Sequence, residues 1–315
     1  MASGHLVNRF YNSSKDTLVL TLLVKNEADI ILDNIFFHYA KGVDFIIVTD
    51  NGSEDGTLEI LEELEKACLI KLLKYDNYAQ HTHVNRMGEI AVRQFGATIL
   101  IHADADEFWN PVKWGKSLKR SFLNLGRPAI LVNRHDVLPT PQSRDKPFPQ
   151  KELNIITKHI YSKNAEKDSL KVSMFLLWLP PKVMFSTKNG PKSVGIGNHL
   201  LAGDNSGDVT DEIIIFHFPF KSEQRFKEKV ILAGKATTSL KTAKSTWWHW
   251  KRWFRQYQNG KLNKEIELLI PDLSKIDGIK YKPFSYNRRI ITPIKRKPRL
   301  WLQYRSYKKH FAKVN

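Results

Sequence analysis

The sequence ATILIHADADEFW, residues 97–109, indicates the fold class of this chain. Its first half is apolar, has the length of a buried strand, and ends abruptly at the carboxylates Asp104, Asp106 and Glu107. Open α/β sheets bind ligands in the crevice at the carboxyl ends of their strands. Carboxylate oxygens suit Mg²⁺ or Mn²⁺, which can neutralise a diphosphate. The stretch therefore predicts a metal-binding edge of a sheet; the alternative is a strand followed by a solvated acidic turn.

Apolar runs and amphipathic segments alternate on the N-terminal side of this stretch. The pattern predicts strands at 17–24, 45–48 and 69–73, and helices at 28–40, 57–67 and 84–95. Such alternation is typical of βαβ units, whose right-handed crossovers bring the carboxyl ends of parallel strands to one edge. Two of these strands, 17–24 and 45–48, and the strand of the opening stretch end at polar residues, namely Asn26-Glu27, Asp50-Asn51 and Asp104 with Asp106. Their convergence at one edge predicts a binding site.

The pattern loosens after Trp109. We expect a helix over 111–123, strands at 129–132, 173–179, 183–185 and 213–217, and a helix that opens at Ser222. The sequence after residue 240 has a different, strongly basic character. We therefore expect an α/β domain over residues 1–240 and a basic, aromatic-rich helical extension over 241–315.

The composition excludes several classes of protein. A chain of 315 residues with 42% hydrophobic residues can bury a substantial core, and no apolar run approaches the length of a membrane span. The first residues lack the pattern of a signal peptide. A single cysteine, Cys68, excludes an internal disulfide and a cysteine-based zinc site, and its apolar neighbours predict a core position. We therefore expect a cytoplasmic protein.

The net charge of +18 is concentrated near the C-terminus. No acid follows Asp277, whereas 12 lysines and arginines do. Together with the aromatic run Trp247–Arg255, this composition resembles a segment that lies at the inner surface of an anionic membrane. The alternative is that the tryptophans pack the tail onto the domain. Single-stranded nucleic acid is a third and less favoured partner.

Three motifs, in order, resemble glycosyltransferase family 2. They are Val24-Lys25-Asn26-Glu27, Thr49-Asp50-Asn51-Gly52-Ser53-Glu54-Asp55-Gly56-Thr57 and Asp104-Ala105-Asp106-Glu107-Phe108. They match the branch of that family whose motifs read DNGSxDGT and DxDEF. The resemblance covers residues 17–110. His217-Phe218-Pro219 with Lys221-Ser222 resembles a later element of the same branch.

The resemblance implies a GT-A fold, with a mixed sheet flanked by helices, and an inverting glycosyltransferase. The donor would be a nucleotide-diphosphate sugar, a UDP-sugar more than a GDP-sugar, used with Mn²⁺ or Mg²⁺. The acceptor would be a glycan or a lipid-linked molecule. A sugar that leaves a diphosphate develops negative charge, which a metal in a dry cleft offsets.

The resemblance also implies roles for individual residues. Asp50 would bind the nucleoside, and Asn26, Glu27 and Asn51 would line the donor pocket. Asp104 would lie near the ribose and the metal, and Asp106 would ligate the metal. Glu107 would orient the groups that bind the metal. For Asp50 the alternative is an Asx-turn that opens its loop. For Glu27 the alternative is an acid that stabilises a helix N-terminus.

Other assignments are weaker. Arg86 and Lys221 are candidates for contact with the donor, and His217 is a candidate third metal ligand. The general base that inverting transfer needs is not evident. The candidates are Asp136, Asp204, Asp208, Asp211 and Glu212, and among them we favour Asp204. Two other functions stay open: a metal-dependent nucleotidyltransferase, and a degenerate transferase fold that binds nucleic acid or membrane.

Overall fold

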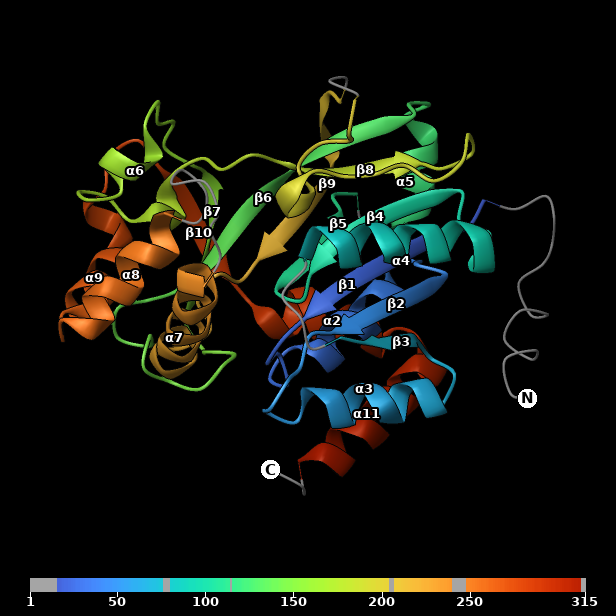
Figure 1. The fold of residues 1–315 in the computed structure, drawn as a ribbon, viewed down its shortest axis with the longest axis horizontal. Helices are drawn as coiled ribbons and strands as arrows, with labels where there is room; N and C mark the ends of the chain where they lie inside the picture. The colour runs from blue at the N-terminus through green and yellow to red at the C-terminus, as the bar shows by residue number, and fades with distance from the viewer. Residues whose placement is uncertain (1–15, 76–79, 114, 204–206, 240–247, 313–315) are drawn as a thin grey trace. The chain divides into compact units, whose positions relative to one another are not determined.

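The computed structural model describes residues 16–75, 80–113, 115–203, 207–239 and 248–312, which form the elements labelled in Figure 1. Contacts divide the chain into two compact units. The first unit comprises Met1–Arg134, Pro180–Ile215 and Asn287–Asn315, and the second comprises His135–Leu179 and Phe216–Tyr286. The domain boundary expected after residue 240 stays a prediction. The contacts assign 241–286 to the second unit and 287–315 to the first.

A mixed sheet forms the centre of the first unit. Its parallel part has the order β4-β1-β2-β3, made of β1 (Leu18–Val24), β2 (Phe45–Asp50), β3 (Lys71–Lys74) and β4 (Ile99–Asp104). Its antiparallel part continues from β4 to β8 (Lys182–Ser186) and to the beginning of β6 (Ala129–Pro139). β5 (Glu107–Pro111) pairs with β9 (Val209–His217). The predicted α/β class with a mixed sheet is therefore confirmed.

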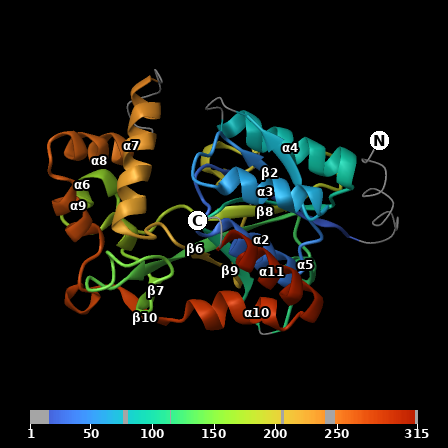
Figure 2. The ribbon, with the colours of Figure 1, turned by 90° about the horizontal axis from the view of Figure 1, so that it is seen from below.

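Helices cover both faces of this sheet. In Figure 2, α4 (Gln80–Phe95) lies on one face of the parallel strands and α2 (Ile31–Ala40) on the other. The remaining helical elements of the first unit are α3 (Thr57–Lys66), α5 (Leu118–Asn124), η2 (Ile196–Asn198), η4 (Asn287–Ile291), α10 (Thr292–Lys295) and α11 (Pro298–Phe311). Contacts join α10 and α11 to α2. The C-terminal helices thus form an outer layer over α2.

Continuous apolar runs build the parallel strands because both faces of the sheet are covered. Every residue of β2 is buried, and so are six of the seven residues of β1. Alternate strand residues face α4, where Val19, Ile47 and Leu100 pack against Val84 and Met87.

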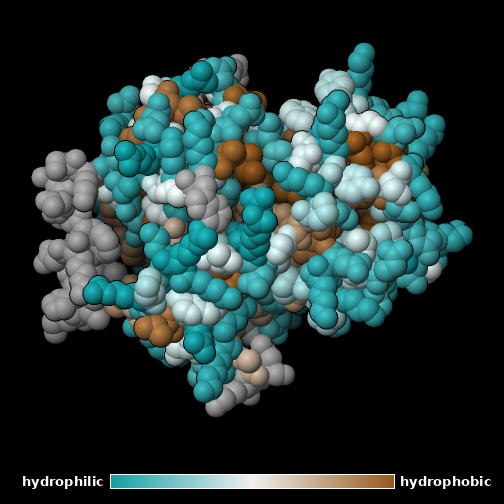
Figure 3. All heavy atoms as spheres, turned by 180° about the vertical axis from the view of Figure 1, so that it is seen from behind, coloured by the Kyte–Doolittle hydropathy of each residue, from teal (hydrophilic) through white to brown (hydrophobic). Residues whose placement is uncertain are grey.

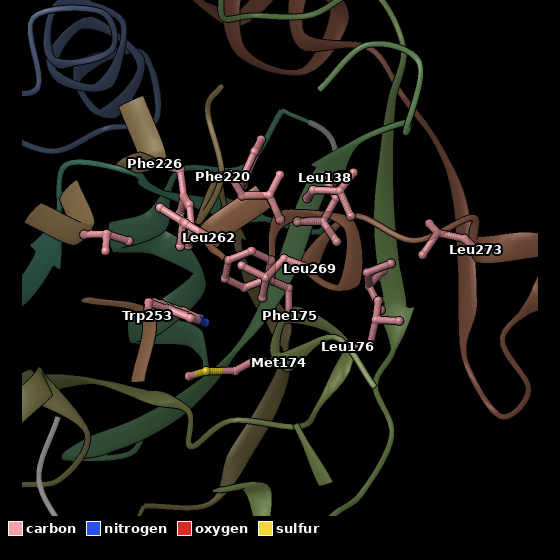
Figure 4. Packing of buried hydrophobic residues seen from close by; sticks show 14 residues of the cluster. Leu138, Met174, Phe175, Leu176, Phe220, Phe226, Trp253, Leu262, Leu269 and Leu273 are labelled. Carbon is pink, nitrogen blue, oxygen red and sulfur yellow. The ribbon is translucent and has the colours of Figure 1, made fainter. Parts of the chain in front are cut away.

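The second unit has its own core. Its strands are the end of β6, β7 (Leu153–Lys158) and β10 (Lys280–Phe284), paired antiparallel. Its helical elements are α6 (Ala165–Asp168), η1 (Met174–Leu176), α7 (Glu223–Ser239), α8 (Trp248–Gln258), α9 (Leu262–Leu269) and η3 (Leu273–Lys275). Figure 4 shows that Phe175, Phe226 and Trp253 lie together in the core of this unit. The Phe226 and Trp253 rings meet edge to face with centroids 5.1 Å apart.

Trp253 shows how part of the aromatic run packs, and the membrane-surface interpretation of the run stays a prediction. Its side chain is buried in the core of the second unit, and Trp248 and Trp250 are half-buried against the same cluster. These tryptophans therefore pack the helix that carries them onto its own unit. Trp247 lies outside the described residues.

Three local expectations were wrong. The helix expected over 111–123 begins only at Leu118, where the Ser117 hydroxyl caps it, because residues 107–111 form strand β5 instead. The run 173–179, expected as a strand, contains the single turn η1, whose side chains are buried in the second core. Cys68 is exposed, in a left-handed conformation just after α3.

No helix in the described part of the chain is both long and apolar enough to cross a bilayer. On the face that Figure 3 shows, hydrophilic side chains predominate, and the hydrophobic ones form separate groups among them.

Candidate functional site

The register of the sheet brings two of the predicted acidic residues to one level. Val24, the last residue of β1, pairs with Asp50 on β2, and Leu23 pairs with Asp104 on β4. Neighbouring strands lie about 4.8 Å apart, so Asp50 and Asp104 flank β1 at a backbone separation of about 10 Å. The predicted convergence of these loops at one edge of the sheet agrees with this register.

Asp50 combines a structural contact with an available acceptor. Its Oδ2 accepts hydrogen bonds from the backbone N–H groups of Gly52 and Ser53, both at 3.0 Å. This is the turn that sequence reasoning offered as the alternative to ligand binding. The second oxygen, Oδ1, is buried and has no hydrogen-bond partner among the residues described. A buried carboxylate oxygen without a donor is costly, and a ligand hydroxyl or amide could satisfy it.

The loop after β1 is tied to the loop after β2. Asn26 adopts a left-handed conformation with a φ of 56°, and its Oδ1 accepts a 2.8 Å hydrogen bond from the Glu54 N–H. The Glu27 N–H donates to the Thr57 hydroxyl at 2.8 Å. The Asn51 N–H donates to the Val24 carbonyl at 2.9 Å. Asn26 therefore shapes the edge of the sheet through its side chain, and Glu27 and Asn51 do so through their backbone.

An aromatic pair lies beside Asp50. The Tyr75 N–H donates to the Asp50 carbonyl at 3.0 Å, and the Tyr75 ring stacks on His83 with centroids 4.4 Å apart. The guanidinium carbon of Arg86 lies 5.5 Å from the centroid of the Tyr75 ring. Arg86, which was predicted to contact the sugar donor, is exposed. It lies near this edge of the sheet because its guanidinium packs on Tyr75. Sequence reasoning missed Tyr75, because nothing in its local context marks it.

Helix α2 holds the backbone of the acidic loop. The Asn34 side-chain amide donates to the carbonyls of Ala105 and Glu107, at 2.8 and 2.9 Å. One turn later, His38 Nε2 accepts from the Trp109 N–H at 3.1 Å, which leaves its Nδ1 to donate to the Asn34 carbonyl at 2.9 Å. Burial lowers the pKa of His38 to about 3, so the neutral ring that this arrangement requires persists at neutral pH.

A buried lysine contacts the acidic loop. Lys182 Nζ lies 2.8 Å from Asp104 Oδ2 and 3.1 Å from Glu107 Oε1. Burial alone would favour the neutral amine, but the carboxylates of Asp104 and Glu107 outweigh it and raise the pKa of Lys182. Glu107 also accepts a 3.2 Å hydrogen bond from the Asp104 N–H. The orienting role of Glu107 toward a metal stays a prediction.

A second cation and a neutral imidazole lie beside Lys182. The Arg134 guanidinium donates to the Pro180 carbonyl at 3.3 Å, and its charge acts on both Lys182 and His199. His199 Nδ1 donates to the Pro181 carbonyl at 2.9 Å. Burial, together with the charge of Lys182, lowers the pKa of His199 to about 4. The edge that carries Asp104 therefore presents both carboxylates and cations.

The chemistry of these donors fits a divalent cation that is shared with a substrate. Asp104, Asp106 and Glu107 carry three negative charges and Lys182 carries one positive charge, which leaves a net charge of −2. Within the described ranges, no group of three or more histidine, cysteine or acidic side chains is arranged to hold a metal by itself. Mg²⁺ commonly uses only one or two protein carboxylates and takes its other ligands from phosphates and water. Asp104 and Asp106 fit that pattern.

The later candidates lie in the second unit. His217 Nδ1 lies 2.5 Å from Asp136 Oδ1, and His159 Nε2 lies 3.3 Å from Asp136 Oδ2. Burial opposes ionisation of Asp136, but the two histidines outweigh it and hold the pKa of this carboxyl well below its usual range. Lys221 is buried, and its carbonyl accepts a hydrogen bond from the side chain of Gln150. The assignment of His217 to a metal stays a prediction.

Most candidates for the general base have other contacts. Asp204, the favoured one, lies outside the described residues. Asp208 pairs with Arg127 at 2.9 Å, and Glu212 pairs with Lys113 at 2.9 Å, both near the surface. Asp211 is exposed. The identity of the base therefore stays a prediction.

No protein-family model matches the chain, and no curated protein matches it. Solved structures are similar at low TM-score. A crystal structure of residues 1–349 of S. aureus TarS in complex with UDP-GlcNAc is 14% identical, with a TM-score of 0.38 over 80% of this chain and 72% of that chain. The mannosyltransferase PcManGT from Pyrobaculum calidifontis, in complex with GDP-Man and Mn²⁺, is 14% identical, with a TM-score of 0.36 over 94% and 84%.

A crystal structure of 4-diphosphocytidyl-2C-methyl-D-erythritol synthase is similar over a smaller part, 43% of this chain and 65% of that one, with 10% identity and a TM-score of 0.27. Likenesses at these TM-scores do not identify a function.

Proposed function

We propose that this chain is a glycosyltransferase that uses a nucleotide-diphosphate sugar and a divalent metal. One observation carries the proposal: among the residues that the structure describes, none donates to the buried Oδ1 of Asp50, which lies at the sheet level where Asp104 begins the acidic loop. A nucleoside hydroxyl or amide at Asp50 and a diphosphate near Asp104 would occupy opposite sides of the end of β1. The ordered motifs that resemble glycosyltransferase family 2, with its GT-A fold, support the same assignment.

The residues of the first unit then have distinct roles. Asp50 accepts a hydrogen bond from the nucleoside, and Tyr75 offers an aromatic surface beside it. Asp104 and Asp106 would hold Mn²⁺ or Mg²⁺, which supplies positive charge to the diphosphate that leaves. Lys182 binds Asp104 and Glu107 and thereby keeps the acidic loop in one conformation.

The acceptor side of the proposal rests on the resemblance. It includes inverting transfer to a glycan or lipid-linked acceptor, Asp204 as general base, Lys221 as a donor contact and His217 as a third metal ligand.

A thermal-shift panel tests the donor site. UDP-, GDP-, CMP- and dTDP-sugars are each added with and without Mn²⁺. A ligand that binds only the folded state stabilises it by about 2.7 kcal/mol at 100 times its Kd, so a donor should raise the Tm by several degrees. We expect a shift for one nucleotide class, strongest with Mn²⁺. Asp50→Asn should abolish this shift because it removes the carboxylate, and Asp106→Asn should abolish its dependence on Mn²⁺.

The matched control is Glu63→Gln, which removes a carboxylate that pairs with exposed Lys66 in the same unit and should leave the shift unchanged. The absence of a shift with every donor, in a folded sample, would contradict the proposal and favour a degenerate transferase fold. Product analysis separates the remaining alternative. A glycosyltransferase releases a nucleoside phosphate as it transfers sugar, whereas a nucleotidyltransferase incorporates the nucleotide into its product.

A further inference from the structure

The surface formed by η4, α10 and α11 is strongly cationic; we call it the basic face. Its exposed lysines and arginines are Arg288, Arg289, Lys295, Arg296, Lys297, Arg299, Arg305 and Lys309. No acid follows Asp277 in the sequence, so the segment that forms this face has no acidic side chain of its own. Burial, together with the charges of Arg289 and Arg296, lowers the pKa of nearby Lys41 to about 8.

The basic face belongs to a packed element. On its inner side, the Tyr304 hydroxyl donates to Asp33 Oδ1 at 2.8 Å, and Lys308 Nζ lies 2.7 Å from the same oxygen. The Tyr304 and Tyr307 rings pack against Phe36, with centroids 5.5 and 6.1 Å away. Helix α11 therefore presents its cations from a fixed backbone, which lowers the entropic cost of binding a surface.

An aromatic and an aliphatic residue lie among these cations. Trp301 is half-buried, with Lys295 Nζ 5.3 Å and the guanidinium carbon of Arg305 5.8 Å from its ring centroid. Its neighbour Leu302 is 67% exposed. Tryptophan beside lysine, arginine and an exposed leucine is the composition of helices that lie in the headgroup region of a bilayer.

The same residues argue against single-stranded nucleic acid. Proteins that bind single-stranded nucleic acid have exposed aromatic rings on which bases stack. The Trp301 ring already stacks on Tyr304, with centroids 5.4 Å apart and planes 21° apart, and two cations lie against it. We propose that the basic face binds the surface of an anionic phospholipid bilayer, with its cations on the headgroup phosphates and Leu302 at the acyl boundary.

Vesicle flotation of the whole chain tests this proposal without donor, acceptor or metal, so its result is independent of the proposed function. The vesicles contain phosphatidylcholine alone or mixed with phosphatidylglycerol. We expect binding to the mixed vesicles only, and release at high salt, because surface charges are screened. The triple variant Lys297→Gln, Arg299→Gln and Lys309→Gln should bind about 100-fold more weakly, since each cation near an anionic surface contributes roughly fivefold.

A matched triple variant removes the same charge elsewhere. Lys151→Gln, Lys163→Gln and Lys171→Gln change three exposed lysines of the second unit. This control should bind the mixed vesicles as the unchanged chain does, and both triple variants should keep its Tm. Equal weakening by both variants, equal binding to neutral vesicles, or binding to single-stranded RNA without binding to vesicles would overturn the proposal.

Discussion

Lys182 shows how a single buried charge can organise the acidic loop. It lies on β8, 78 residues from Asp104, and its ammonium contacts both Asp104 and Glu107. Glu107 is fully buried. A buried ion pair adds little net stability over an apolar pair, but the loss of one partner leaves an uncompensated charge in the protein interior. The cost of removing Lys182 should therefore be far larger than that of removing a surface lysine.

We predict that Lys182→Met lowers the free energy of unfolding by about 3–5 kcal/mol, measured by urea denaturation. Adding Glu107→Gln to this variant should restore part of the loss, because the second change removes the unpaired charge. The matched control is Lys188→Met, whose exposed ammonium pairs with Asp16 at 2.8 Å. It should cost no more than about 1 kcal/mol. Additive effects of Lys182→Met and Glu107→Gln would contradict the proposed coupling.

Part of the candidate site could be predicted from the sequence at the level of residues. Asp50, Asp104 and Asp106 could be predicted because they follow buried strands at one edge of the sheet. Asn34 and Lys182 could not, since their partners lie 71 to 78 residues away. A polar side chain inside an apolar segment indicates that it has a buried partner, but it does not identify the partner residue.

Single elements differ in how well their sequence predicts them. The strands and helices of residues 17–104 could be predicted from the sequence. Strands that are covered on both faces have continuous apolar sequences, and the helices that cover them have amphipathic sequences. The short strand β5 could not, because its buried sequence EFWNP follows directly on acidic residues and resembles a loop. The run 173–179 is apolar because it fills the second core, where it forms the turn η1.

Helix α11 gives a prediction at the level of elements. Its Tyr304 donates a hydrogen bond to Asp33, a buried carboxylate, and such bonds contribute about 1.5–3 kcal/mol. Tyr304→Phe should lower the free energy of unfolding by that amount and speed tryptic cleavage after the lysines and arginines of α11. Tyr161→Phe removes a hydroxyl from a side chain that is 71% exposed, and it should change neither measurement. Unaltered cleavage of the Tyr304→Phe variant would show that other contacts hold the helix.

For the whole molecule, buried neutral histidines link stability to pH. Burial lowers the pKa of His38 and of His102 to about 3, with Lys182 also acting on His102. In the unfolded chain both histidines bind a proton near pH 6.5, whereas in the folded protein they stay neutral down to about pH 3. The stability that follows from this difference is complete above pH 6.5 and is lost as the pH falls toward 3. Each histidine costs about 1.4 kcal/mol per pH unit below 6.5.

We therefore expect the free energy of unfolding to fall by about 4 kcal/mol between pH 7 and pH 5 from these two residues. Urea denaturation over a pH series measures it. His38→Gln keeps an acceptor for the Trp109 N–H and a donor for the Asn34 carbonyl, but does not titrate. It should reduce the slope below pH 6 by about 1.4 kcal/mol per pH unit. An unchanged slope would mean that His38 is already protonated in the folded protein.

The position of α11 also has a consequence for biosynthesis. This helix follows the whole second unit in the chain, yet it belongs to the first unit, where it covers α2. The ribosome therefore synthesises β1 to β4 and α2 long before it synthesises α11, the helix that covers α2. Throughout that interval Phe36 lacks the rings of Tyr304 and Tyr307 that pack against it, and apolar surface exposed on a nascent chain promotes aggregation. We expect a chain whose translation stops before residue 298 to leave this surface of α2 exposed, because it lacks α11.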